Sequence, residues 1–350
     1  MAAAGVELAV DQRELAVGGI FEALTSLTRV IRAWGDMMRC LREHDPDLVI
    51  LVDSGGFNLP FARRVRKRSR AKIFYYVAPQ VWAWRPGRLR KLAERTDRIA
   101  VILPFEREYY AARGVDVDFV GHPILDQSAN DLSATPLERR QRARARIGLE
   151  EGALVLGLYP GSRRSEVDRH LELLIESFRK LRRVRPELHA VIARAPTLDS
   201  EDFTVRLATV AGDLADSIHH VSGETPESLD AVDVAIAKPG TITLELLLRG
   251  CPMVVTGRAH PWTARIVRRS LQAAYLALPN LLTGKEIVPE RIQEDAQPDR
   301  IAAAVEPLFE GPGRTRQVEA LATARDRLGP RGAAILGAQI VEDLIGTPSA

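Results

Sequence analysis

The feature that most constrains the fold is a repeated alternation of short apolar runs with longer amphipathic segments, which begins at residue 46. Short apolar runs bounded by turn residues are typical of strands in a buried parallel sheet, and the amphipathic segments are typical of helices that cover it. The alternation therefore predicts an α/β protein with helices on both faces of parallel sheets. The strands expected are Leu48–Val52, Lys72–Val77, Arg98–Leu103, Asp118–Val120, Leu154–Tyr159, Leu188–Ala193, Ile218–Val221, Val232–Ala237 and Met253–Val255.

An interruption of this alternation predicts two domains. Residues 127–148 are polar and rich in arginine, and strands resume only at Leu154. We expect two doubly wound, Rossmann-like domains over residues 1–148 and 149–325 with a ligand cleft between them, and a C-terminal helix over 326–350 that packs back on the first domain. The helices expected include 61–69, 86–95, 105–113, 165–183 and 241–249, and an N-terminal one with the apolar stripe Ile20, Leu24, Leu27, Ile31, Trp34, Met38 and Leu41.

The composition disfavours several classes of protein. No apolar run approaches the roughly 18–20 residues of a membrane span, and the N-terminus lacks a signal-peptide pattern. Two cysteines, Cys40 and Cys251, provide neither a disulfide framework nor a metal cluster, and the seven histidines show no ligand spacing. We therefore expect a cytoplasmic protein without a structural metal or a cofactor.

One segment carries a large excess of positive charge. Residues 61–95 contain twelve Lys and Arg residues and one acidic residue, Glu94, which gives +11, against +3 for the whole chain. Such a segment is typical of a surface that meets phospholipid, a phosphorylated substrate or nucleic acid, although most charge runs only solvate a face. An aromatic content of 5% and the lack of a recognisable binding motif disfavour nucleic acid as the partner.

Two tryptophans stand within this basic segment. Amphipathic rings beside cations suit the headgroup level of a membrane, so we expect an anionic membrane surface as a partner. The alternative is that one of the rings packs in the helix layer. The residues expected to contact the membrane are Trp82, Trp84, Arg85, Arg88 and Lys91.

Two glycine turns, each between a predicted strand and a predicted helix, are candidates for binding phosphate. The first contains Gly161, Ser162 and Arg163, and the second contains Gly240 and Thr241. At such a turn, free backbone N–H groups and the positive end of the helix dipole converge, and an arginine fork matches phosphate oxygens. The alternatives are that these are ordinary strand-to-helix turns, and that Arg163 only forms a surface ion pair with Glu166.

A carboxylate one turn into the second helix extends this interpretation. Glu245 is placed to accept hydrogen bonds from ribose hydroxyls, although it would also complement the helix dipole. Two phosphate-type turns without a Walker lysine motif indicate the diphosphate of a nucleotide sugar rather than ATP.

Nine sequence pieces in a fixed order carry a family resemblance. They are RELAVGGIFEAL (13–24), PDLVILVDSGGFN (46–58), YYVAPQVWAWRPGR (75–88), LPFEREYY (103–110), FVGHPILD (119–126), LYPGSRRSEV (158–167), KPGTITLEL (238–246), CPMVV (251–255) and LPNLLTGKEIVPE (278–290). In this combination the chain resembles the lipid A disaccharide synthases, which are inverting glycosyltransferases of the GT-B fold.

The resemblance implies a reaction in the lipid A biosynthesis of a Gram-negative bacterium. UDP-2,3-diacylglucosamine and 2,3-diacylglucosamine 1-phosphate (lipid X) would condense to the β-1,6-linked tetraacyl disaccharide 1-phosphate, with release of UDP. It also implies peripheral association with the inner face of the cytoplasmic membrane. Another UDP-sugar transferase or epimerase, and a non-catalytic nucleotide-sugar-binding or lipid-binding paralogue, are the alternatives.

The resemblance also assigns roles to single residues. Asp53, at the end of a predicted strand, would be the general base or would orient the acceptor's 6-hydroxyl, unless it only caps the following turn. His122 would be the alternative base or a donor to substrate phosphate, with a purely structural role as the other reading. Asn280, on a loop, is expected to reach the donor or the acceptor across the cleft, and we place it among the donor-binding residues.

The chain departs from the family pattern at two places. The family's first strand and glycine loop have no counterpart, so we expect the first βα unit to be missing, through a misassigned start or in an inactive paralogue. Lys238 and Pro239 replace a small residue and a serine, and Lys238 would add charge near the diphosphate. The oligomeric state stays open, a homodimer included.

Overall fold

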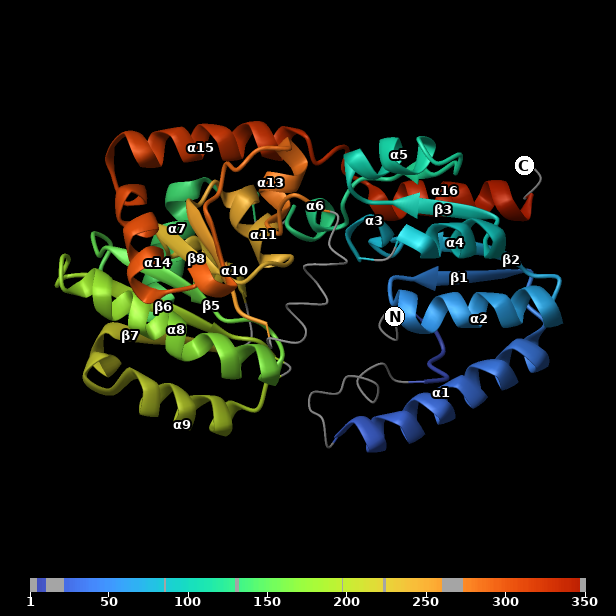
Figure 1. The fold of residues 1–350 in the computed structure, drawn as a ribbon, viewed down its shortest axis with the longest axis horizontal. Helices are drawn as coiled ribbons and strands as arrows, with labels where there is room; N and C mark the ends of the chain where they lie inside the picture. Colours follow the sequence, from blue (N-terminus) through green and yellow to red (C-terminus); the bar gives the residue numbers. More distant parts are fainter. Residues whose placement is uncertain are drawn as a thin grey trace. The chain divides into compact units, whose positions relative to one another are not determined.

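The computed structural model describes residues 5–10, 22–84, 86–129, 132–196, 198–222, 225–259 and 273–346. The chain forms two compact units (Figure 1). The first unit contains the described residues up to Val120 together with those from Gly332 onward. The second contains the described residues from Gly121 to Arg331.

The boundary between the units lies at 120/121 and not at the expected 148/149. Helix α7 (Pro136–Ile147) packs on α10 (Thr225–Asp230), which is also in the second unit. Arg139 and Arg144 on α7 form largely buried ion pairs with Asp230 and Asp233, both at 3.0 Å. The arginine-rich composition of this segment therefore reflects ion pairs inside the second unit rather than a connector between domains.

The first unit is built on a four-stranded parallel sheet in the order β1-β2-β3-β4. The predicted strands of this part of the chain are confirmed to within two residues. The strands are β1 (Leu48–Val52), β2 (Lys72–Tyr76), β3 (Arg98–Val101) and β4 (Asp118–Phe119). The helices are α1 (Glu22–His44), α2 (Gly55–Arg68), α3 (Val81–Trp84), α4 (Leu89–Arg95), α5 (Pro104–Ala111) and α16 (Ala333–Ile345).

Helices cover both faces of this sheet, as the alternation predicted. On one face Val65 of α2 and Met38 of α1 belong to the same buried cluster as Ile73 and Tyr75 of β2. On the other face α16 packs against β2, so closely that a Cβ on Gly337 would lie 3.0 Å from the ring of Tyr76. The C-terminal helix thus lies on the sheet of the first unit.

The predicted N-terminal helix is α1, but only part of its predicted stripe can be placed. Trp34, Met38 and Leu41 pack in the core of the first unit, whereas Ile31 is 61% exposed. Ile20 lies outside the described residues, as do the side chains of Leu24 and Leu27.

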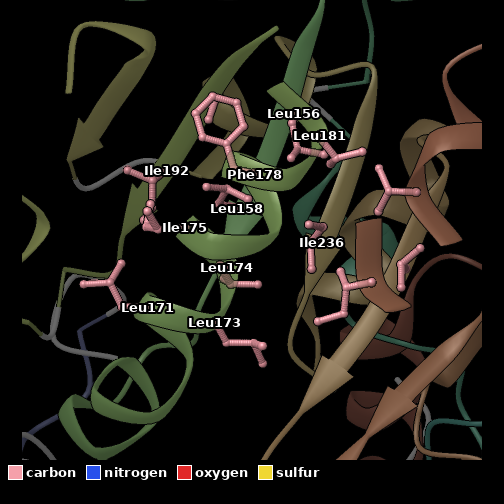
Figure 2. Close-up of a cluster of buried hydrophobic side chains, with 14 of the residues drawn as sticks. Leu156, Leu158, Leu171, Leu173, Leu174, Ile175, Phe178, Leu181, Ile192 and Ile236 are labelled. Atoms are coloured by element: carbon pink, nitrogen blue, oxygen red, sulfur yellow. The ribbon is translucent and has the colours of Figure 1, made fainter. Parts of the chain in front are cut away.

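The second unit has a six-stranded parallel sheet in the order β10-β9-β8-β5-β6-β7. Its core, drawn in Figure 2, joins apolar side chains of α8 such as Leu174 and Phe178 to Leu156, Leu158 and Ile236 of the sheet. The strands are β5 (Val155–Tyr159), β6 (His189–Arg194), β7 (Ile218–Ser222), β8 (Val234–Ala237), β9 (Met253–Gly257) and β10 (Glu290–Ile292). The helices besides α7 and α10 are α6 (Ile124–Gln127), α8 (Arg164–Arg182), α9 (Ser200–Ala211), α11 (Ile242–Arg249), α13 (Leu278–Thr283), α14 (Pro298–Val305) and α15 (Gly311–Asp326).

Candidate active site

A pocket lies where the strand order of the second sheet reverses. The chain runs outward from β5 through β6 to β7, and then returns beside β5 with β8 and runs outward the other way. The carboxyl ends of strands at such a switch point form a crevice that binds ligands in open α/β sheets. Here the crevice is a pocket of about 340 Å³. Six predicted donor-site residues line it together: Gly161, Ser162, Arg163, Gly240, Thr241 and Glu245.

The first glycine turn is closed by a carboxylate from the helix that follows it. The Glu166 Oε2 atom accepts hydrogen bonds from the backbone N–H groups of Ser162, at 3.1 Å, and Arg163, at 3.3 Å. Gly161 has φ of 119°, and a Cβ there would lie 2.6 Å from the same oxygen. Only glycine fits this turn without moving Glu166. The side chain of Arg163 is 76% exposed, and its Nη1 atom lies 3.8 Å from Glu166 Oε1.

Lys238, at the start of the second glycine turn, extends its ammonium group to the first glycine turn. Lys238, directly after β8, forms an ion pair with Glu166 Oε1 at 3.0 Å. Burial favours the neutral form of Glu166, but the hydrogen bond and charge of Lys238, with the two backbone donors, outweigh burial and lower its pKa. Helix α11 follows without a side-chain cap, and the N–H groups of Thr241 and Ile242 donate to no other residue in the described parts of the chain. These groups suit an anionic ligand.

Arg194 is a pocket residue that the sequence analysis missed. It ends β6 and lines the pocket, and its Nε atom is buried without a hydrogen-bond partner among the described residues. Its Nη1 atom donates to the carbonyl of Leu198. A cation at the carboxyl end of a predicted strand, as with Arg194 after Leu188–Ala193, is the sequence signal that identifies such a residue.

Asn280 does not serve the donor site as predicted. It is fully buried, and its Oδ1 atom accepts from the N–H groups of Ile287 and Val288, both at 2.8 Å. Its Nδ2 atom donates to the Val288 carbonyl at 2.8 Å and to Glu290 Oε1 at 2.9 Å. Every polar atom of the side chain is therefore used to fold residues 278–290, and none is left for a ligand.

Asp53 stands on a strained turn at the carboxyl end of β1. Asp53 and Ser54 have φ of 46° and 40°, and Val77 at the end of β2 has φ of 58°. Left-handed backbone is uncommon outside glycine and is an outlier for a β-branched residue. The turn is held by its backbone, because the Asp53 carbonyl accepts from the hydroxyl of Tyr75 at 2.5 Å and from the Asn58 amide at 2.9 Å. The Asp53 side chain takes no part in these bonds and is exposed. Strain of this kind clusters at functional sites.

Arg88 lies at the same turn. A Cβ on Gly55 would be 2.8 Å from Pro79 and 3.9 Å from Arg88 Nη1, so Gly55 lets the chain pass close to this guanidinium. Burial raises the pKa of Tyr75, and the charges of Asp53 and Arg88 act on it in opposite directions. Arg88, which we expected at a membrane surface, is thus half-buried at the turn that follows β1.

His122 is a neutral hydrogen-bond donor at pH 7. Its Nδ1 atom accepts from the backbone N–H of Ile124 at 3.1 Å, which assigns the ring proton to Nε2. Burial lowers the pKa of His122 to about 4. The preceding Gly121 has φ of 80°, and a Cβ there would lie 2.3 Å from the Pro330 carbonyl oxygen. The turn is fixed by this close approach of two backbone segments.

The predicted membrane contact through Trp82 is wrong. Trp82 is 6% exposed, packs edge-on against Phe105, and donates its indole N–H to Glu106 at 2.8 Å. Trp84's side chain and Arg85 lie outside the described parts of the structure, and Lys91 is exposed. No helix in the described part of the chain is both long enough and apolar enough to cross a membrane. Further exposed cations of this unit lie on α2: Arg63, Arg64, Lys67 and Arg68.

The fold and the pocket together define a protein of the GT-B class. Solved structures of low sequence identity share this fold. The UDP-GlcNAc 2-epimerase from Neisseria meningitidis, bound to UDP-GlcNAc, has a TM-score of 0.62 at 14% identity and covers 91% of this chain and 81% of that one. The trehalose 6-phosphate synthase from Burkholderia multivorans has a TM-score of 0.55 at 15% identity, over 96% and 79% of the two chains.

Sequence comparison identifies the family within this class. The pattern of the lipid-A-disaccharide synthetase family matches residues 1–329. The lipid-A-disaccharide synthase of Geobacter metallireducens is 36% identical over 350 residues, which is 99% of this chain and 88% of that protein. The synthase of Myxococcus xanthus is 38% identical over 346 residues, with the same coverage. The chain therefore belongs to the lipid-A-disaccharide synthetase family.

Proposed function

We propose that the protein condenses UDP-2,3-diacylglucosamine with 2,3-diacylglucosamine 1-phosphate to the β-1,6-linked disaccharide 1-phosphate. The observation that carries this proposal is the pocket in which both glycine turns and Glu245 meet, in a chain of this family. The acceptor's 6-hydroxyl oxygen attacks C1 of the donor sugar, and the bond from C1 to the diphosphate oxygen breaks. The hydroxyl proton passes to a base, and UDP leaves with the bonding electrons.

The donor side of the reaction needs positive charge at the leaving diphosphate. Arg163, Lys238 and Arg194 line the pocket, and the uncapped N-terminus of α11 opens into it. Preorganised donors and charges of this kind stabilise the charge that develops in the transition state, and removing one costs on the order of 10²-fold in rate. Glu245, on the same helix, is the group we assign to the ribose hydroxyls.

For the base, the chemistry of the two candidates favours Asp53. His122 has no free lone pair in its ring, because Nδ1 accepts from Ile124 and Nε2 carries the proton. Asp53 presents an exposed carboxylate on a turn that is held by its own backbone. We therefore assign proton abstraction to Asp53 and a hydrogen bond to substrate to His122.

The test is disaccharide formation from the two substrates in detergent, detected by mass. We expect product from wild type, a loss on the order of 10²-fold or more in Asp53→Asn, and a smaller loss in His122→Asn. Asn keeps the shape of Asp without its basicity. No product from folded wild type would refute the proposed reaction, and an unimpaired Asp53→Asn variant would refute the assignment of the base.

We also propose that the protein associates peripherally with the inner face of the cytoplasmic membrane, where diacylated substrates reside. The exposed cations of α2, with Lys91, are the support for this proposal. Arg64→Glu/Lys67→Glu should lower the partition constant onto anionic liposomes, measured by sedimentation, by about 30-fold or more, since each basic side chain near such a surface contributes about 1 kcal/mol. Arg183→Glu/Arg316→Glu, on exposed positions of the second unit, makes the same change in charge. Equal loss in both pairs would indicate net charge alone and contradict docking through α2.

A further inference from the structure

The donors that would hold a diphosphate are occupied by the protein's own carboxylate. Glu166 Oε2 lies against the N–H groups of Ser162 and Arg163, where a phosphate oxygen is expected under the proposed function. These distances of 3.1 and 3.3 Å lie at and just beyond the long end of the about 2.7–3.2 Å range of N–H···O hydrogen bonds. The carboxylate is thus a weak occupant of this position and can be replaced by a better acceptor.

Lys238 lies within reach of both the Glu166 carboxylate and a diphosphate bound between the two glycine turns. Its Nζ atom is 3.0 Å from Glu166 Oε1, in the first turn. It is also 4.0 Å from the position of a Cβ on Gly240, so it lies over the second turn. With 30% of its side chain exposed, the ammonium group borders the pocket and is not sealed in the core. A small rotation about its flexible stem moves it from the carboxylate to a ligand between the turns.

The Glu166 carboxylate and a diphosphate cannot bind the same backbone N–H groups at once, because both are negatively charged. Glu166 is held ionised by Lys238 and by the two backbone donors. A diphosphate brought to the same donors carries negative charge as well, so the two anions repel. The ligand must therefore displace Glu166 from the N–H groups and take Lys238 from it.

We propose that Glu166 is an internal competitor for the diphosphate position, and that Lys238 exchanges from Glu166 to the diphosphate when the nucleotide binds. This inference rests on the proposed function of the pocket. It assigns opposite effects to two residues of one ion pair. Lys238 strengthens nucleotide binding, and Glu166 weakens it and restores the closed turn when UDP leaves.

Calorimetric titration of the 350-residue chain with UDP and with uridine tests the exchange. Lys238→Gln should weaken UDP binding by roughly tenfold, because it removes a charged hydrogen bond to phosphate. Glu166→Gln should tighten UDP binding by roughly two- to fivefold, because it removes the negative charge that competes with the diphosphate, and an ion pair at a surface is worth up to about 1 kcal/mol. Gln still caps the helix at this position, so the turn is retained. Lys238→Arg should bind UDP nearly as wild type does.

The affinity for uridine shows whether a variant changes binding through the diphosphate or through a general disturbance of the pocket. It lacks the diphosphate, so its affinity should be the same in wild type and in all three variants. Unchanged UDP affinity in Lys238→Gln, or weaker UDP binding in Glu166→Gln, would overturn the inference. If wild type binds uridine and UDP equally, both the inference and the diphosphate site fail. If UDP binds with the expected pattern but no disaccharide forms, the exchange stands and the proposed reaction fails.

Discussion

Gly161 shows at the scale of one residue how a missing side chain defines the pocket. Its φ of 119° and the 2.6 Å between an added Cβ and Glu166 exclude alanine from the turn as it stands. Gly161→Ala should therefore lower the free energy of unfolding by about 1–3 kcal/mol, through backbone strain and displacement of Glu166. Urea unfolding measures this effect. Gly152→Ala is the matched control, because Gly152 has open space around it and no positive φ. Equal effects of the two substitutions would contradict this account.

Single residues also show which parts of the site a sequence reveals. That Gly161 and Gly240 meet in one pocket was predictable because each lies between a strand and a helix at the same edge of the sheet, and Glu245 joins them because it lies in the first turn of α11. Asn280 and Trp82 were predicted as contact residues and are buried instead. The type of a polar residue does not tell whether its partners are inside the protein. Asn280 is satisfied by residues up to ten positions along the chain, and Trp82 by Glu106.

At the scale of elements, helix α2 begins six residues before the predicted start at residue 61. Two glycines and Pro60 in this stretch are typical of a loop. The helix forms because the Ser54 carbonyl accepts from Phe57 and Asn58, and because the Asn58 amide also donates to the Val52 and Asp53 carbonyls. These bonds depend on the strained turn at Asp53, which no propensity signals. The early start brings the N-terminus of α2 to the turn that carries the proposed base.

His122, in the turn between β4 and α6, predicts how the free energy of unfolding depends on pH. Burial lowers the pKa of His122 from 6.5 to about 4, so the unfolded chain binds more protons between these values. The contribution of His122 to the free energy of unfolding is fully present above about pH 6.5. It is lost as the pH falls toward 4, which lowers the free energy of unfolding by roughly 2–3 kcal/mol. His122→Asn should therefore lose less stability than wild type between pH 7.5 and pH 4.5. Urea unfolding at both values measures it. Identical losses in the two proteins would show that His122 does not titrate with folding.

At the scale of the whole molecule, the number of units follows from the sequence, but their boundary does not. Two alternating series of strands predict two parallel sheets, and both are present. The boundary was misplaced because the partners of α7 are far along the chain: Arg139 pairs with Asp230 and Arg144 with Asp233. A polar helix with distant partners has the same composition as a solvated linker. Only the pairing distinguishes the two, and a single sequence does not contain it.

Helix α16 packs on the sheet of the first unit, so a substitution in α16 should destabilise the first unit and leave the second unchanged. Gly337 of α16 packs on Tyr76, and a Cβ there would be 3.0 Å from the ring. Gly337→Leu should lower the stability of the first unit by about 1–3 kcal/mol through overpacking. Hydrogen exchange should then quicken in β1–β4 and stay unchanged in β5–β9. UDP affinity should stay at the wild-type value, because every residue that lines the pocket belongs to the second unit.

The neighbouring residue of the same helix supplies the control for this change. Ala338 is exposed, so Ala338→Leu adds the same side chain to α16 without pressing on the sheet. It should leave exchange in β1–β4 as in wild type. If both leucines accelerate exchange equally, the effect comes from the helix itself and not from its contact with β2. If Gly337→Leu accelerates exchange in β5–β9 as well, the two units unfold as one cooperative body and the division into independent units is wrong.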